Sequence, residues 1–207
     1  MKTIWGRLTS INVAKAVWAA REVNIPFDRI DVGGPFGKLD TPEYGALNPN
    51  RKIPTLDDEG FILWESNSIV RYLAAQYGAG GLWAADARER ALGDRWLDWQ
   101  ACEFGPAMGV VFLGLIRTPE EKRNHQAIAD ATARANKMLP IVEQTLAGGR
   151  AFIAGERFGV GDIALGCALD RWYQLPVERP AMPRIEQYLA RLRARPAAQG
   201  ILQQPLV

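Results

Sequence analysis

The spacing of apolar and polar residues divides the chain into two parts of different character. In the first 77 residues, short strand-like runs alternate with helix-like runs. The stretches 2–5 and 26–32 predict strands, and between them apolar residues recur at the i, i+3, i+4, i+7 spacing of an amphipathic helix: Val13, Ala16, Val17 and Ala20. The first β-α-β order therefore predicts a parallel strand pair joined by a crossover helix.

A hairpin and a second helix complete this first part. Strand-like runs at 54–56 and 61–64 flank Asp57-Asp58-Glu59-Gly60, which is typical of a hairpin turn. The glycine-rich stretch 33–37 predicts a plain loop. Apolar residues then return to helical spacing: Ile69, Val70, Leu73, Ala74 and Tyr77. The hairpin should add antiparallel strands to the parallel pair.

Beyond residue 86 the pattern is helical almost throughout. Pro106 should interrupt the first helix of this part, because proline lacks the N–H that a helix interior needs. Thr118-Pro119-Glu120-Glu121 predicts a helix start with a capping box, and the helix should run to Gly148. Residues 163–175 are apolar nearly all round, as in a buried central helix, and a last helix should cover 185–192. We therefore predict an α/β domain at 1–77, a linker at 78–85 and an all-helical domain at 86–207.

Composition and charge exclude several classes of protein. With 48% hydrophobic and 23% charged residues the chain is typical of a globular protein. No run approaches the roughly 20 apolar residues of a membrane span, and no signal peptide opens the chain, so we expect a cytoplasmic protein. The net charge of +2 without a basic stripe gives no indication of nucleic-acid binding.

Cysteine and histidine are scarce. The 2 cysteines, Cys102 and Cys167, lie in apolar stretches and are expected to be buried, inert thiols. The 1 histidine, His125, follows a charged segment and should be solvated. These numbers exclude a disulfide framework and a Cys/His zinc site of ordinary spacing, so no metal is expected. Any chemistry must come from hydroxyls, carboxylates, amides or a bound cofactor.

Three motifs in a fixed order narrow the range of possible functions. They are Ser10-Ile11-Asn12 after the first strand, Asn48-Pro49-Asn50-Arg51-Lys52-Ile53-Pro54, and Glu65-Ser66 about ten residues later. Over essentially the whole chain this order resembles the cytosolic glutathione transferases, in particular bacterial theta- and nu-like members of the Ser/Thr type. The resemblance implies a thioredoxin-like domain joined to an all-helical domain, a homodimer, and glutathione as co-substrate for detoxification of small apolar electrophiles.

The resemblance also assigns the ends of glutathione to residues of this chain. It implies that the Ile53–Pro54 peptide bond is cis, so that the backbone of Ile53 pairs with the cysteinyl unit like an added strand. Asn50 and Lys52 would meet the glycyl carboxylate, whereas Arg51 could be a surface charge instead. In the last motif, at a helix N-terminus, Glu65 would bind the γ-glutamyl ammonium and Ser66 the γ-glutamyl carboxylate. Ser66 also fits an ordinary helix cap.

Ser10 is the candidate catalytic residue, and its task would be to stabilise the thiolate of glutathione. Lowering the pKa of a thiol from about 8.5 by ~2 requires roughly 2.7 kcal/mol of preference for the thiolate. A hydrogen bond to a charged group supplies about 1.5–3 kcal/mol, so the Ser10 hydroxyl nearly suffices, and Asn12 or the helix N-terminus could add the rest. Ser10 also fits the role of a simple N-cap. Lys15, on the same predicted helix, is interpreted as a surface charge. The first tyrosine, Tyr44, is misplaced for a tyrosine mechanism.

Other residues have weaker assignments. Asp162 precedes the most apolar helix and is expected to cap it rather than to react. The second substrate would pack against apolar side chains of the helical domain: Phe104, Met108, Phe112 and Trp172. The resemblance further places Asp94 and Asp98 where they could reach a partner's site. Two alternatives stay open: a glutathione-dependent disulfide or hydroperoxide reductase, and a non-catalytic scaffold of the same fold.

Overall fold

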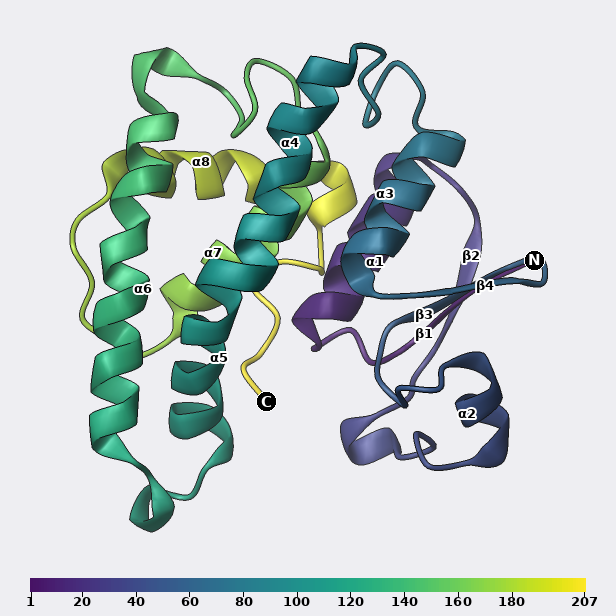
Figure 1. Cartoon of the computed structure of the whole chain (residues 1–207), viewed down its shortest axis with the longest axis horizontal. Coiled ribbons are helices and arrows are strands. Elements are labelled where there is room, and N and C mark those ends of the chain that lie inside the picture. The colour runs from purple at the N-terminus through teal and green to yellow at the C-terminus, as the bar shows by residue number, and fades with distance from the viewer. The chain divides into compact units, whose positions relative to one another are not determined.

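The computed structural model describes residues 1–207, which form two compact units, Met1–Ala85 and Asp86–Val207. The first unit is mixed α/β and the second is helical, so the predicted fold class is confirmed (Figure 1). Residues 78–85 belong to the first unit. There Ala79 and Trp83 form an isolated β-bridge, and the amide of Trp83 donates to the Gly78 carbonyl at 2.9 Å. This segment therefore contains a hydrogen-bonded turn.

The sheet of the first unit has the strand order β2-β1-β3-β4. β1 (Lys2–Trp5) runs parallel to β2 (Phe27–Ile30) and antiparallel to β3 (Thr55–Asp58). β3 continues through a tight turn into β4 (Phe61–Trp64), with Asp58 opposite Phe61. The predicted parallel pair and the predicted hairpin are both confirmed.

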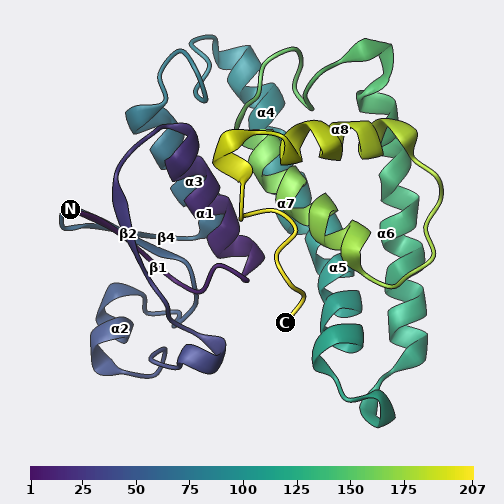
Figure 2. The same ribbon diagram turned by 180° about the vertical axis from the view of Figure 1, so that it is seen from behind.

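Three helices accompany this sheet. α1 (Ile11–Glu22) and α3 (Ser66–Tyr77) lie side by side in Figures 1 and 2 and supply much of the core of the unit. α2 (Pro42–Leu47) was not predicted. It is a six-residue helix whose first turn is capped by the Thr41 hydroxyl, which accepts from the Tyr44 amide at 3.2 Å. A helix this short has too few turns to show an apolar period. The predicted loop at 33–37 likewise contains a short 3-10 turn, Gly34–Phe36.

A buried carboxylate ties α3 to the sheet. Asp58 accepts hydrogen bonds from the hydroxyls of Tyr72 at 2.7 Å and Tyr77 at 2.6 Å, and the Lys2 ammonium lies 3.4 Å away. Burial by itself would raise the pKa of Asp58. The two tyrosine hydroxyls and the Lys2 charge outweigh it and hold that pKa below its ordinary value.

We expect Asp58 to make the first unit sensitive to acid. A carboxyl group with a depressed pKa contributes stability above its unfolded pKa and loses it as the pH falls through the folded value, here below about pH 4. Asp58→Asn should therefore unfold about 1–3 kcal/mol more easily at pH 7, with a smaller difference at pH 3. Urea titrations at both pH values, with hydrogen exchange of the α3 amides, measure this. Asp57→Asn is the matched control, and equal pH dependence of the two variants would contradict the prediction.

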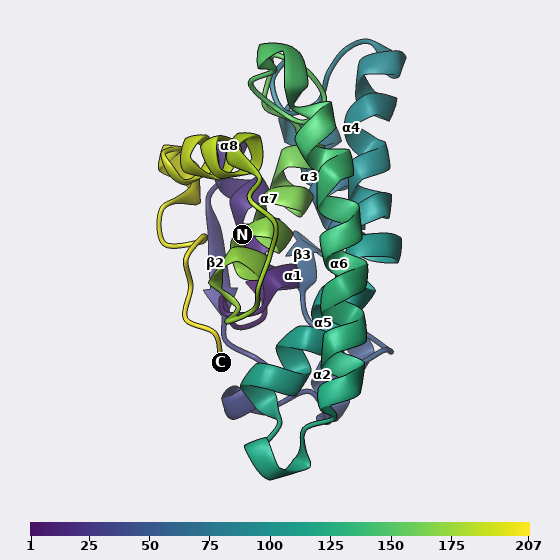
Figure 3. The same cartoon turned by 90° about the vertical axis from the view of Figure 1, so that its left-hand side faces the viewer.

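The second unit contains α4 (Ala87–Trp99), α5 (Gly105–Phe112), α6 (His125–Thr145), α7 (Val160–Gln174) and α8 (Pro183–Arg193) (Figures 2 and 3). α4 and α5 form one helical run to residue 117, interrupted by π-helical segments at Gln100–Phe104 and Leu113–Arg117. The first of these segments directly precedes Gly105 and Pro106, so the interruption expected at this proline is confirmed.

α7 is the buried helix of this unit, as its apolar sequence predicted. Its first turn is held by Asp162, which is fully buried. The carboxylate accepts from the Ile153 amide at 2.8 Å, the Gly159 amide at 2.8 Å and the Tyr188 hydroxyl at 2.7 Å. Because Gly159 has no side chain, the amide of Asp162 donates to the Gly159 carbonyl instead, at 3.0 Å. This geometry matches the structural role expected for Asp162.

The predicted helix start at Thr118 is wrong. Residues Glu120–Lys122 form a single 3-10 turn, and α6 begins only at His125. Its cap is Asn124, whose side-chain oxygen accepts from the Ala127 amide at 3.0 Å. The Thr118 hydroxyl donates to the Leu113 carbonyl at 2.9 Å, so it serves the end of the preceding helical run. Two capping signals compete here, and the second one starts the helix.

Two other expectations about the helical part need correction. Cys167 is buried and His125 is exposed, as expected, but Cys102 is exposed, because Gln100 and Phe104 occupy the buried positions of its π-helical segment. In addition, the helical run Ala87–Arg117 is long and apolar enough to cross a bilayer by length and composition alone, which was not expected from the sequence. A core helix meets the same criterion, and Leu97 and Phe104 of this run are fully buried.

Candidate functional site

The loop between β1 and α1 holds Ser10 in place through its backbone. The Gly6 amide donates to the Ile30 carbonyl at 2.8 Å, and the Ser10 amide donates to the Arg7 carbonyl at 3.1 Å. Ser10 occupies the N-cap position of α1 with extended backbone angles, but its side chain makes no capping hydrogen bond. Ser10 as a whole residue is half-buried. It is therefore available to a ligand, and the capping role that competed with the chemical one is not realised.

A hydrogen bond joins the N-termini of α1 and α3. The Ser66 hydroxyl donates to the side-chain oxygen of Asn12 at 3.3 Å. Ser66 is buried, whereas Asn12 is exposed. The bond orients the Asn12 amide, because its oxygen faces Ser66 and its two N–H donors must then point elsewhere. The structure thus brings together Asn12 from the first predicted motif and Ser66 from the third.

Glu65 adopts an unusual backbone conformation at the start of α3. Its φ of 70° lies in the left-handed region, where non-glycine residues are rare, and such a residue costs about 1–3 kcal/mol. Its side chain is exposed and makes no capping bond. Strained residues of this kind concentrate at functional sites. The first turn of α3 therefore combines an exposed carboxylate with N–H groups that have no acceptor inside the helix.

The Ile53–Pro54 peptide bond is cis, as the resemblance implied. The carbonyl of the preceding Lys52 accepts from the Tyr44 hydroxyl at 2.7 Å and from the Asn48 side-chain amide at 2.8 Å. Ile53 lies close to the loop that carries Ser10, since a Cβ atom placed on Gly6 would be 3.1 Å from the Cβ of Ile53. The second motif therefore neighbours the first.

The remaining residues of the second motif divide into exposed and anchoring ones. Asn50 and Lys52 are exposed, and the backbone and side-chain amides of Asn50 donate to the Asn48 side-chain oxygen at 3.0 and 3.3 Å. Arg51 is more than a surface charge: its guanidinium donates to the carbonyls of Leu39 at 2.9 Å and Thr41 at 3.0 Å. Arg51 thus ties the motif to the segment that begins α2.

Sequence reasoning missed three residues that build this site. Tyr44 and Asn48 hold the Lys52 carbonyl, and burial, partly offset by the Thr55 hydroxyl, raises the pKa of Tyr44, so its phenol remains a hydrogen-bond donor. Lys15, interpreted as a surface charge, is only 2% exposed, and its ammonium donates to the Asn67 side-chain oxygen at 2.8 Å. Asn48 opens the second motif, which was a usable signal, whereas no local pattern marks Tyr44 or Lys15.

Comparison with known proteins decides the family. A family model described as the glutathione S-transferase N-terminal domain matches residues 9–76, and one described as the C-terminal domain matches residues 106–196. The chain belongs to the glutathione S-transferase family. The transferase is 35% identical to glutathione S-transferase GstB of Escherichia coli K12, and the alignment covers 100% of both chains.

Solved structures agree with this assignment. The transferase matches a theta class glutathione S-transferase of Xanthomonas axonopodis pv. citri with glutathione bound, with a TM-score of 0.94 and 46% identity over 100% of this chain and 99% of the other. Glutathione transferase F2 of Populus trichocarpa, with a TM-score of 0.87 and 24% identity over 97% of each chain, shares the fold. The resemblance inferred from the motifs is therefore confirmed at the level of the family, the fold and the class of enzyme.

The four candidates for the second substrate are buried in the helical unit of the transferase. Phe104 and Trp172 are fully covered, with ring centroids 5.8 Å apart, and Met108 is 5% exposed. The ring of Phe112 contacts two guanidinium groups, those of Arg117 at 5.1 Å and Arg171 at 4.7 Å from its centroid. These are contacts of core side chains, so their role toward a second substrate stays a hypothesis.

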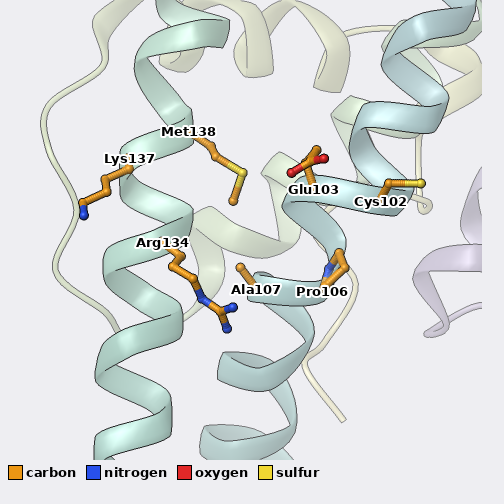
Figure 4. A pocket seen from close by; sticks show the side chains of 7 residues that line it. All are labelled: Cys102, Glu103, Pro106, Ala107, Arg134, Lys137 and Met138. Carbon is orange, nitrogen blue, oxygen red and sulfur yellow. The ribbon is translucent and has the colours of Figure 1, made fainter.

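A separate pocket of about 340 Å³ lies between the helical run and α6. Figure 4 shows Arg134 and Met138 extending from α6 toward Ala107 and Glu103, while Lys137 extends away from them. The lining is completed by Cys102 and Pro106. None of the four predicted second-substrate residues lines this pocket.

Proposed function

We propose that the transferase binds reduced glutathione on its first unit and stabilises the thiolate with the Ser10 hydroxyl. The observation that carries the proposal is that Ser10 is half-buried, that its hydroxyl forms no capping bond, and that it follows a loop adjacent to Ile53. The thiol proton leaves to solvent. The thiolate then forms a C–S bond with an electrophilic carbon, which releases a leaving group or adds across a double bond. No protein base is required.

The ends of the tripeptide have chemically matched partners in this proposal. The backbone of Ile53, beside Pro54, pairs with the cysteinyl unit. Asn50 and Lys52 offer an amide and a cation to the glycyl carboxylate. At α3, the backbone N–H of Ser66 and the helix N-terminus take the γ-glutamyl carboxylate, because N–H groups without an acceptor inside the helix and a partial positive charge favour an anion there. The Ser66 hydroxyl adds a further donor when it turns from Asn12 to the ligand. The carboxylate of Glu65 accepts from the γ-glutamyl ammonium, and the Asn12 amide supplements Ser10.

We further propose that the transferase acts as a cytoplasmic homodimer in the detoxification of small apolar electrophiles. Exposed large apolar side chains on both units support self-association, among them Phe61 at 50%, Trp64 at 38% and Leu113 at 50% exposure. Glutathione recognition belongs to residues 1–77 in this proposal. The helical unit contributes the apolar face for the second substrate, for which Phe104, Met108, Phe112 and Trp172 remain the candidates.

The proposal is tested by one set of measurements on the whole protein. Calorimetric titration should show binding of reduced glutathione, and conjugation of an aryl halide should exceed reduction of a hydroperoxide and of a mixed disulfide in parallel assays. His125→Gln, a change at an exposed position, should keep every rate. Faster reduction than conjugation would favour the reductase alternative. Absence of binding to both reduced and oxidised glutathione would leave only the scaffold alternative.

A further inference from the structure

A buried ammonium group lies between α1 and α3. Lys15 is on α1, three residues after Asn12, and is 2% exposed. Its Nζ donates to the side-chain oxygen of Asn67 at 2.8 Å. Asn67 is the second residue of α3 and directly follows Ser66. The two helices run side by side at this point (Figure 1).

Two neighbouring hydrogen bonds therefore join the N-terminal turns of α1 and α3. On α1 the residues involved are Asn12 and Lys15, which are neighbours on the helix surface because they are three positions apart. On α3 they are the consecutive residues Ser66 and Asn67. The Lys15–Asn67 bond is the shorter of the two, at 2.8 Å against 3.3 Å. The Lys15–Asn67 bond restrains the first turn of α3, which carries Ser66.

Stability alone does not account for a lysine in this place. Removing an ammonium from water is costly, and replacing a buried charged group by a well-packed apolar residue is often neutral or stabilising. Methionine has a similar length and would fill the same space. The ammonium does supply a positive charge close to a helix N-terminus, which already carries a partial positive charge. Both charges attract an anion at the first turn of α3.

We propose that Lys15 is a positioning residue that sets the affinity and selectivity of the first turn of α3 for the γ-glutamyl α-carboxylate. It acts through Asn67, which holds Ser66 in place, and through its charge behind the helix N-terminus. This inference rests on the proposed glutathione site.

The test compares Lys15→Met, Lys15→Arg and, as a matched control, Lys137→Met at an exposed helical position. Lys15→Met should unfold at the same or a higher urea concentration, yet raise both the Kd and the KM for glutathione about tenfold. The kcat at saturating glutathione should stay within about twofold. Affinity for the dipeptide Cys-Gly, which lacks the γ-glutamyl group, should not change. Lys15→Arg should recover part of the loss, and Lys137→Met should behave as the parent protein.

Several outcomes would overturn the inference. If the parent protein binds glutathione and Lys15→Met binds it equally well, Lys15 does not position this site. If affinity for Cys-Gly falls as much as affinity for glutathione, or if affinity and urea stability fall together, Lys15 has only a general structural role. If the parent protein itself does not bind glutathione, the proposed function fails first, and this inference falls with it.

Discussion

Replacement of Ser10 by alanine should lower the fraction of bound glutathione that is thiolate at neutral pH by about 10- to 100-fold, because the variant loses a hydrogen bond to a charged group worth about 1.5–3 kcal/mol. The pKa of the bound thiol should rise accordingly, and kcat/KM for conjugation should fall by a similar factor. The affinity for glutathione should stay nearly constant, since the hydroxyl favours the thiolate over the thiol and not the tripeptide as a whole.

The decisive measurement is the thiolate absorbance of the glutathione complex as a function of pH. Ser10→Thr is the matched control, because it keeps the hydroxyl and should keep the low pKa. Ser66→Ala should instead weaken binding and leave the absorbance curve nearly in place. A Ser10→Ala curve that coincides with that of the parent protein would remove Ser10 from the mechanism.

Loss of the Asp162 carboxylate should have the largest effect on folding. Asp162→Ala leaves the buried donors of Ile153, Gly159 and Tyr188 without their acceptor, and we expect the free energy of unfolding to fall by about 3–5 kcal/mol. Urea denaturation measures this. Asp130→Ala, at an exposed position of α6, should change stability by less than about 0.5 kcal/mol. A loss of that small size for Asp162→Ala would contradict the structural role.

Asp162 should also leave a pH signature opposite in sign to that of Asp58. Burial raises the pKa of Asp162 to about 6, although its three hydrogen-bond donors lower it. A carboxyl group with a raised pKa contributes stability that is complete below its unfolded pKa, about 4, and that is lost as the pH rises through the folded value. The stability of the parent protein should therefore decline from pH 4 to pH 6 relative to Asp162→Asn. Parallel curves for the two proteins would refute the assignment.

The sequence alone determined the elements that depend on local periodicity and on motif order. Two strands, Lys2–Trp5 and Phe61–Trp64, have the bounds that were predicted, and the buried helix α7 follows from its apolar sequence. The family was visible because Ser10, the Ile53–Pro54 motif and Glu65-Ser66 come in a fixed order. Such signals are readable because they rest on side-chain spacing and turn chemistry within a few residues.

Only the tertiary structure decided which polar groups form hydrogen bonds within the protein and which are available to a ligand. Ser10 and Ser66 both begin helices, yet the Ser10 hydroxyl makes no capping bond while the Ser66 hydroxyl donates to Asn12, 54 positions away along the chain. Lys15 is buried because α3 packs over it, and Tyr44 holds the Lys52 carbonyl because α2 lies beside the cis-proline loop. The cost of burying a polar group, and the partner that offsets it, depend on contacts between distant segments, which no local pattern encodes.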